Sequence, residues 1–132
     1  MKKIALDTNF LMIPWQFKVD IFSEFDRICN FNYKLYIFEE SISELRNIIH
    51  KAKGKDKKAA QIALKLIKLK NINIINSEKK DVDSLILENT GEYDYVATQD
   101  MALKRELVKK GVSLIVLRSK KHLILNERVK SV

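Results

Sequence analysis

Residues 3–7, KIALD, form a short apolar run that ends at an acid. A run of this length is typical of a strand that is buried in a sheet. A second run of the same kind, YVA at 95–97, is followed within three residues by Asp100. Both stretches therefore predict a buried strand that leads into a carboxylate.

Outward from these two strands, strand-like and helical patterns alternate along the chain. Apolar runs predict further strands at 35–38, 72–75 and 114–117, and the shorter run 123–125 could add an edge strand. Apolar residues at helical spacing predict helices over 19–31, 41–49, 56–70, 81–89 and 100–110. This alternation favours an α/β fold of three layers, in which helices cover both faces of a parallel sheet.

Several boundaries depend on single residues. Pro14 should break the chain after the first strand. Ser41 and Glu44 match a capping box that would open a helix running toward Ile49. Gly111 should end the helix at 100–110, because glycine readily adopts the conformation that follows a helix. The helix at 56–70 should direct inward Ile62, Ala63, Leu66, Ile67 and Leu69.

Composition narrows the class of protein. The 132 residues, 46% hydrophobic and 32% charged, suit one domain over 1–132. The single cysteine, Cys29, excludes an intramolecular disulfide, and two histidines exclude a His-rich metal site. No apolar run approaches the roughly 20 residues of a membrane span, and Asp7 interrupts the first run too early for a signal peptide. We expect a cytoplasmic protein that does not bind membranes.

The net charge of +8 is concentrated in one element. Residues 51–70 hold eight lysines and one aspartate, which leaves a net charge of +1 for the other 112 residues. A weaker basic cluster lies in the C-terminal end, about 118–132. Lysines gathered in this way suit a nucleic acid, because they displace the counterions of phosphates. The alternative is a solvated helix face that only keeps the protein soluble.

Four acids are expected at one edge of the sheet, where the carboxyl ends of parallel strands meet. Each follows a different predicted strand or begins the helix after it: Asp7, Glu44, Asp83 and Asp100. Any one of them alone could cap a turn or a helix. Together they would repel one another unless a cation neutralised them.

The ligand types indicate which metal this edge would bind. An all-oxygen site without His or Cys suits Mg²⁺ or Mn²⁺ rather than Zn²⁺. Such ions can activate a water and stabilise the leaving oxygen in phosphodiester cleavage. An acidic metal site beside a basic element is the combination that cutting a nucleic acid requires.

Four stretches resemble motifs of the PIN-domain nuclease family. They are LDTNFL at 6–11, SEL at 43–45, VDSLI at 82–86, and VATQD at 96–100 with Leu103 and Arg105. Within the family, the chain looks most similar to short archaeal PIN proteins that resemble the PIN endonuclease of small-subunit rRNA processing. The resemblance implies a PIN-like domain with five parallel strands in the order 3-2-1-4-5.

The resemblance also implies a site. As metal-binding and catalytic acids it implies Asp7, Glu44, Asp83 and Asp100. It implies that Thr98, as a further catalytic residue, and Thr8 orient ligands or the attacking water, while Asn9 supports the loop. The expected cofactor is Mg²⁺ or Mn²⁺.

The sequence departs from the family pattern at two places. Val82 separates two acids that are often adjacent in the family. Asp81 would point about 200° away from Asp83 around a helix axis, so Asp83 is the expected ligand. Gln99 stands where a smaller polar or acidic residue is common, so we expect no auxiliary ligand there.

Basic residues in three segments are expected to contact RNA. They lie in the basic helix and the residues just before it, in the last motif, and near the C-terminus. They are Lys51, Lys53, Lys55, Lys57, Lys58, Arg105, Arg118, Lys120 and Lys121.

Three functions compete. The resemblance favours an endoribonuclease that processes ribosomal precursor RNA. A toxin-type PIN ribonuclease paired with a small antitoxin would have the same fold and activity, and the extra basic residues disfavour it. A non-catalytic RNA-binding ribosome-assembly factor is the third, and the four repulsive carboxylates argue against it. The apolar stretch 10–17 could support a homodimer.

Other residues have structural interpretations. Trp15 and Phe17 could stack on a base, although packing is favoured. Asp94 precedes the fourth strand, so it should lie at the opposite end of the sheet. Glu39 and Glu40 rank behind Glu44 because they are expected in the loop before the helix.

Overall fold

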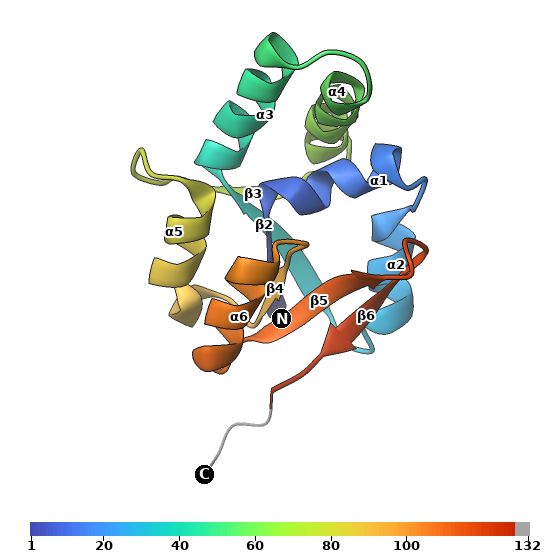
Figure 1. Cartoon of the computed structure of the whole chain (residues 1–132). Helices are drawn as coiled ribbons and strands as arrows, with labels where there is room; N and C mark the ends of the chain where they lie inside the picture. The colour runs from blue at the N-terminus through green and yellow to red at the C-terminus, as the bar shows by residue number, and fades with distance from the viewer. Residues whose placement is uncertain (129–132) are drawn as a thin grey trace.

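The computed structural model describes residues 1–128, and its centre is a six-stranded sheet (Figure 1). The strands are β1 (Lys2–Leu6), β2 (Tyr33–Phe38), β3 (Asn73–Ile75), β4 (Tyr95–Ala97), β5 (Ser113–Arg118) and β6 (His122–Asn126). Their order is β3-β2-β1-β4-β5-β6. The first five are parallel and confirm the predicted order 3-2-1-4-5. The sheet has one strand more than the five that the resemblance implies, because the run 123–125 does form an edge strand, β6, antiparallel to β5.

The sixth strand depends on a tight turn that the sequence hardly signals. Ser119 and Lys120, the central residues of the β5–β6 turn, have φ angles of 55° and 56°. The Lys121 N–H donates to the Arg118 carbonyl at 3.1 Å, which closes the turn. Three residues, 119–121, separate the paired Arg118 and His122, and two of them have a positive φ, a conformation that favours Gly or Asn. Neither Ser119 nor Lys120 is of that type, so the sequence marks the sixth strand only by the short apolar run 123–125.

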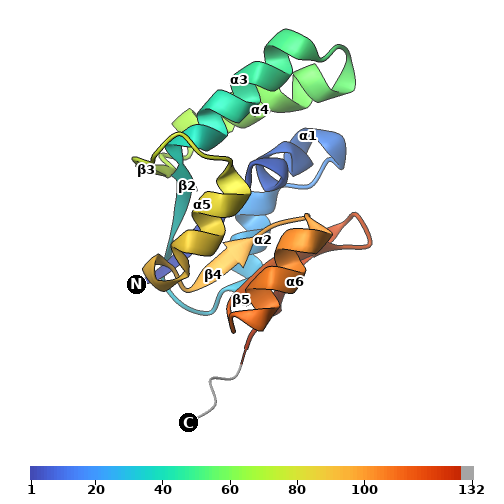
Figure 2. The ribbon, with the colours of Figure 1, turned by 60° about the vertical axis from the view of Figure 1, so that its left-hand side comes forward.

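Helices cover both faces of the sheet (Figure 2). They are η1 (Thr8–Met12), α1 (Ile13–Gln16), α2 (Ile21–Ile28), α3 (Glu39–Lys51), α4 (Lys55–Leu69), α5 (Val82–Glu88), η2 (Thr90–Glu92) and α6 (Met101–Lys109). Helices α5 and α6 pack on one face, while η1, α1, α2 and the α3–α4 pair contribute to the core on the other. The three-layer α/β/α arrangement is therefore confirmed.

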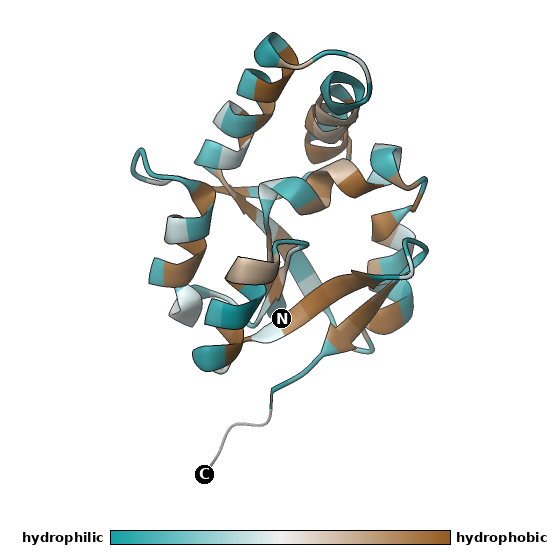
Figure 3. Ribbon diagram, viewed as in Figure 1, coloured by the Kyte–Doolittle hydropathy of each residue, from teal (hydrophilic) through white to brown (hydrophobic). Residues whose placement is uncertain are grey.

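The central strands alternate between two cores. Ile4 and Leu6 of β1 join the core that contains Phe10 and Phe25, while Ala5 joins the core under α5 and α6. These three of the five side chains of β1 are almost completely buried, because a parallel sheet covered on both sides leaves its centre no face to water. The helices show the complementary pattern, with apolar faces turned inward (Figure 3).

The start of α3 differs from the prediction. This helix begins at Glu39, directly after β2, and Phe38 precedes it without a side-chain cap. Ser41 is fully buried inside the helix, so the predicted capping box is wrong. Glu39 and Glu40 form the first turn of α3 rather than a loop, and Glu44 lies one turn later.

Pro14 starts a helix instead of breaking the chain. It lies in the first turn of α1, where its fixed φ and missing N–H are compatible with a helix. The residues around it turn inward: Phe10 and Ile13 are fully buried, and Trp15 and Phe17 pack against the same core. The stretch 10–17 therefore packs largely within the chain, and the homodimer stays a prediction.

The basic helix α4 buries small residues. Ala59, Ala60 and Ala63 are fully buried, whereas Leu69, predicted to face inward, is 74% exposed. Gly111 follows α6 with a φ of 74°, as predicted for a residue that ends a helix. Within the described residues, no helix combines the length and the apolar character needed to cross a membrane. The last part of the predicted basic C-terminal end, 129–132, lies outside the described residues.

Candidate active site

The four predicted acids come from four different elements and meet at the carboxyl ends of the central strands. Asp7 follows β1, Glu44 lies on α3, Asp83 lies in the first turn of α5, and Asp100 precedes α6. Repulsion by Asp83 and Glu44 contributes to a raised pKa at Asp7, and repulsion by Asp100 and Glu44 contributes to a raised pKa at Asp83. The four side chains are therefore close enough to influence one another's charge. We call them the acidic cluster.

Asp7 is the most buried member, with 3% of its surface exposed. Burial raises its pKa from 3.8 to about 6, against the effect of two hydrogen bonds that lower it. The Thr98 hydroxyl donates to Oδ2 at 2.8 Å, and the Thr8 N–H donates to Oδ1 at 2.8 Å. Both oxygens are thus fixed in direction, although no cation is paired with them in residues 1–128.

Glu44 is held by neighbours from two other elements. The Thr8 hydroxyl oxygen lies 2.5 Å from Oε1 of Glu44 and 2.9 Å from the hydroxyl of Ser41. The Val82 N–H donates weakly to the other oxygen, Oε2, at 3.4 Å. These contacts tie α3 to η1 and to the start of α5. Ser41 was missed as part of the site because its position before Glu44 was interpreted as a helix cap.

Thr98 connects two members of the acidic cluster. Its hydroxyl, fully buried, donates to Asp7 and accepts the Asp100 N–H at 3.1 Å. Asp100 in turn caps α6 by accepting the Leu103 N–H at 3.0 Å. One hydroxyl therefore sets the relative positions of the acids that follow β1 and β4.

The structure separates the two acids of the third motif. Asp81 caps α5 by accepting the backbone N–H of Ser84 at 3.0 Å, and these bonds hold its pKa below the ordinary value. Asp83 lies beside Asp100, and its pKa is raised first by burial and then by the charge of its neighbours. Asp83 is the member of this pair that belongs to the acidic cluster.

The acidic cluster fits a hard divalent cation by the chemistry of its donors. Among residues 1–128, no three His, Cys, Asp or Glu side chains converge tightly enough to surround one ion. The cluster nevertheless offers only carboxylate oxygens, with threonine hydroxyls behind them, and oxygen ligands are those that Mg²⁺ and Mn²⁺ prefer. A cation would also relieve the repulsion that raises the pKa values of Asp7 and Asp83.

The predicted RNA-contacting residues flank the acidic cluster without joining it. Five lysines are exposed where α3 ends and α4 begins: Lys51, Lys53, Lys55, Lys57 and Lys58. Arg105 is exposed on α6, and Arg118, Lys120 and Lys121 are exposed at the β5–β6 turn. Asn9 is exposed beside the buried Thr8. Because β5 is parallel to β1, the basic β5–β6 turn lies at the same edge of the sheet as the acids.

Two interpretations from the sequence are confirmed outside the cluster. Asp94 accepts the Lys3 N–H at 2.8 Å and pairs with the Lys2 ammonium at 4.0 Å, so it is a structural acid. Trp15 packs against the core, and the Lys18 ammonium lies 3.2 Å from the centroid of its ring. Both contacts agree with the favoured packing role of this residue.

A family model described as a PIN like domain matches residues 4–120. The chain belongs to the PIN-like domain family. Ribonuclease VapC4 of Methanocaldococcus jannaschii is 32% identical over 126 residues, which cover 92% of this chain and 95% of that protein. Ribonuclease VapC9 of Archaeoglobus fulgidus is 29% identical over 123 residues, which cover 92% of this chain and 87% of that protein.

Solved structures share the PIN-like fold. The PIN domain endonuclease Utp24 superposes with a TM-score of 0.77 and 19% identity, over 98% of this chain and 95% of that one. A domain of a functionally unknown protein from Methanocaldococcus jannaschii gives a TM-score of 0.59 and 16% identity, over 100% and 99% of the two chains. At these identities the likeness establishes the fold. In this PIN-like protein, the acidic cluster lies at the switch point of strand order, where α/β folds bind ligands.

Proposed function

We propose that this PIN-like protein is an endoribonuclease that uses Mg²⁺ or Mn²⁺ to hydrolyse phosphodiester bonds in RNA. The observation that carries the proposal is a cluster of four acids that form no ion pair with any cation of residues 1–128, in a protein whose net charge is +8. The two curated relatives above are both named ribonucleases, which supports RNA as the substrate class.

The proposed roles follow from the contacts of the acids. To hold the cation we propose Asp7, Glu44, Asp83 and Asp100, and the bound ion would supply an activated water and stabilise the departing oxygen. Thr98 positions Asp7 and Asp100 through its single hydroxyl, and Thr8 positions Glu44. Asn9 supports the loop that carries Thr8. Because hydrogen bonds hold Asp7, Glu44 and Asp100 before RNA binds, these three acids need little reorganisation when it arrives.

The basic residues around the cluster are proposed to hold the RNA backbone. The lysines from 51 to 58 lie on one side, and the basic β5–β6 turn and Arg105 lie on others. Phosphates bound at these separate positions would bring the intervening strand across the acids. This arrangement also explains how an RNA can approach a cluster of negative charge.

Ribosomal precursor RNA is the substrate we propose to test first, as the resemblance to rRNA-processing PIN proteins implies. A toxin-type ribonuclease controlled by a small protein partner is the second candidate. We keep this candidate because both relatives are named Ribonuclease VapC. That name gives RNA cleavage as the activity and does not assign it to ribosomal RNA. The two candidates differ in substrate and partner but use the same acids.

The test is cleavage of end-labelled structured RNA by the purified protein with Mn²⁺, with Mg²⁺ or with EDTA. The matched variant carries Asp7→Asn and Asp100→Asn, which preserve the shapes of both side chains. We expect cuts that need the metal and are made by the native protein alone. If both proteins bind RNA equally and neither cuts it, the non-catalytic RNA-binding alternative replaces this proposal.

A further inference from the structure

A groove of about 480 Å³ lies beside the acidic cluster, between the segment η1–α1 and the end of α3. Its size falls within the range of sites for small ligands. One wall carries Asn9, Met12 and Gln16, and the other carries Asn47, Ile48 and Lys51. Neither the acids nor the proposed backbone contacts account for the amides in these walls.

Helix α3 connects the groove with the acidic cluster, because it carries both Glu44 and one wall of the groove. Asn47 and Ile48 follow Glu44 by one helical turn and Lys51 by two, so all four lie on the same side of the helix. The rise of an α-helix places Lys51 about 10 Å beyond Glu44 along the axis. On the opposite wall, Asn9 directly follows Thr8, which contacts Glu44. A strand whose phosphate lies at the acids would therefore have its neighbouring nucleotide in the groove.

The walls combine three kinds of group that suit a nucleobase. Asn9, Gln16 and Asn47 are exposed amides, and each presents both donors and acceptors. Met12 is buried to 5% exposure and Ile48 is half-buried, so the groove has an apolar floor against which a flat ring can lie. Lys51 is exposed at the far end, where Ala52 and the acid Asp56 complete the lining, and its ammonium is the group there that would hold the phosphate following the base.

We infer that this groove holds one unpaired base of the RNA and reads it through Gln16 and Asn47. The inference rests on the proposed function, because the acids must mark the point of cleavage for the groove to hold the adjacent nucleotide. The base must be unpaired, since the deep groove of an RNA duplex hides its base edges from side chains. Cleavage should therefore show a preference for one base at a fixed position beside the cut.

The test measures binding separately from cleavage. Fluorescent single-stranded RNAs that differ at one position are titrated with protein in the Asp7→Asn/Asp100→Asn background, which prevents hydrolysis. We expect about a tenfold preference for one base, the discrimination typical of a good amide–base pair. Gln16→Ala and Asn47→Ala should each reduce that preference severalfold. Asn30→Ala, an exposed asparagine between α2 and β2 at the other end of the sheet, should leave it unchanged.

A phosphate contact provides a second control. Lys57→Ala on α4 should weaken binding of every oligonucleotide by the same factor, because a phosphate carries no base identity. Circular dichroism of each variant confirms that it is folded. This pattern, in which amide variants change the preference and the lysine variant changes only the affinity, is what the inference requires.

The inference is overturned if all bases bind equally, or if the groove variants behave like Asn30→Ala. Equal binding of all bases is also what we would observe if the groove bound a protein segment and no RNA base. Cleavage without any base preference would contradict this inference and leave the proposed function intact. A base preference in a protein that never cuts RNA would contradict the proposed function and leave the groove as a base-binding site.

Discussion

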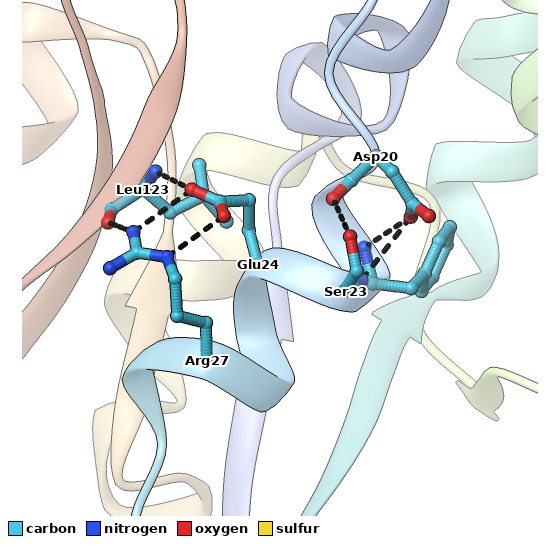
Figure 4. Close-up of polar contacts among 6 residues, drawn as sticks. Asp20, Ser23, Glu24, Arg27 and Leu123 are labelled. Carbon is cyan, nitrogen blue, oxygen red and sulfur yellow. Dashed lines mark hydrogen bonds and ion pairs between the residues drawn. The ribbon is translucent and has the colours of Figure 1, made fainter.

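Glu24 on α2 and the acidic cluster differ in the charge of the groups that surround their carboxylates. Glu24 on α2 accepts both Arg27 Nε and Nη2 at 2.9 Å and the Leu123 N–H at 2.8 Å (Figure 4). The hydrogen bonds and charge of Arg27 hold the pKa of Glu24 below its ordinary value. Asp7 has hydrogen bonds too, but it is buried beside other acids and its pKa is raised to about 6.

The two sites differ in which form of the carboxyl group their neighbours stabilise. At α2 the chain supplies a guanidinium and a backbone N–H, so the charged form of Glu24 is stabilised. In the acidic cluster the chain supplies further acids, although 25 lysines and arginines were available to it. Repulsion retained in a predominantly basic protein is a cost to stability, and such costs concentrate at functional sites.

We expect the largest change in RNA cleavage when Asp83 is replaced, and no change when Asp81, two residues before it, is replaced. Asp83→Asn should lower RNA cleavage about 10³-fold, because it removes a ligand charge worth several kcal/mol in the transition state. Asp81→Asn should leave cleavage unchanged, because Asn caps a helix as well as Asp does. Initial rates of both variants at saturating Mn²⁺ measure the difference. Equal losses would mean that the third motif acts as a unit and that the contrast between cap and cluster fails.

Removing the charge of Asp7 should stabilise the fold, whereas removing the charge of Glu24 should destabilise it. In EDTA at pH 7, Asp7→Asn should raise the free energy of unfolding by about 2–3 kcal/mol, because the buried charge is unfavourable there. Glu24→Gln should lower it by about 1 kcal/mol, because a charged hydrogen bond is weakened. Urea unfolding of the three proteins measures both changes. A loss of stability in Asp7→Asn would show that the fold needs the carboxylate.

The pH dependence sharpens the same comparison. The folded protein binds the Asp7 proton more tightly than the unfolded chain, so the Asp7 contribution to stability falls as pH rises from about 4 to about 6. The advantage of Asp7→Asn should therefore be small near pH 4 and complete at pH 7. For Glu24, whose pKa is lowered, the contribution is present at neutral pH and is lost in acid. An advantage of Asp7→Asn that does not change with pH would contradict the assignment.

A smaller effect tests the hydroxyl that joins two acids. Thr98→Val keeps the side-chain shape but removes the bonds to Asp7 and to the Asp100 N–H. We expect cleavage to fall about tenfold, as is typical when a group that orients a metal ligand is lost. The control is Ser23→Ala, which removes a hydroxyl that donates to the backbone carbonyl of Asp20 at the start of α2, the helix of Glu24. This variant should leave cleavage unchanged. Comparable rates for Thr98→Val and the native protein would assign Thr98 to packing alone.

The sequence predicted best the parts of the fold that packing determines. Strands β1 and β4 are buried on both faces, so their apolar runs are unambiguous, and each leads into an acid of the cluster. The start of α3 was missed because Phe38 precedes the helix without a side-chain cap to mark it. Strand β6 was indicated only by the short run 123–125, because Ser119 and Lys120 adopt positive φ without the usual turn residues.

The groove could not be predicted from the sequence. Gln16 belongs to the short helix α1, which was not predicted because Pro14 was interpreted as a break in the chain. Asn47 follows Glu44 on α3, whose start was predicted at the wrong residue. Their convergence depends on how η1–α1 packs against α3, which no local pattern records. The acids differ in this respect, because the rule for ligand sites in parallel sheets places them at one edge before any packing is known.

The central claim is that the acidic cluster remains without a paired cation in order to bind a divalent metal. The most direct test is thermal unfolding of the native protein, Asp83→Asn and Asp81→Asn as Mn²⁺ is added. We expect a Tm that keeps rising with the logarithm of Mn²⁺ concentration for the native protein and Asp81→Asn, equivalent to about 2.7 kcal/mol at 100 times the Kd, and a much smaller rise for Asp83→Asn. An unchanged Tm in the native protein, or an equal rise in all three, would contradict the claim.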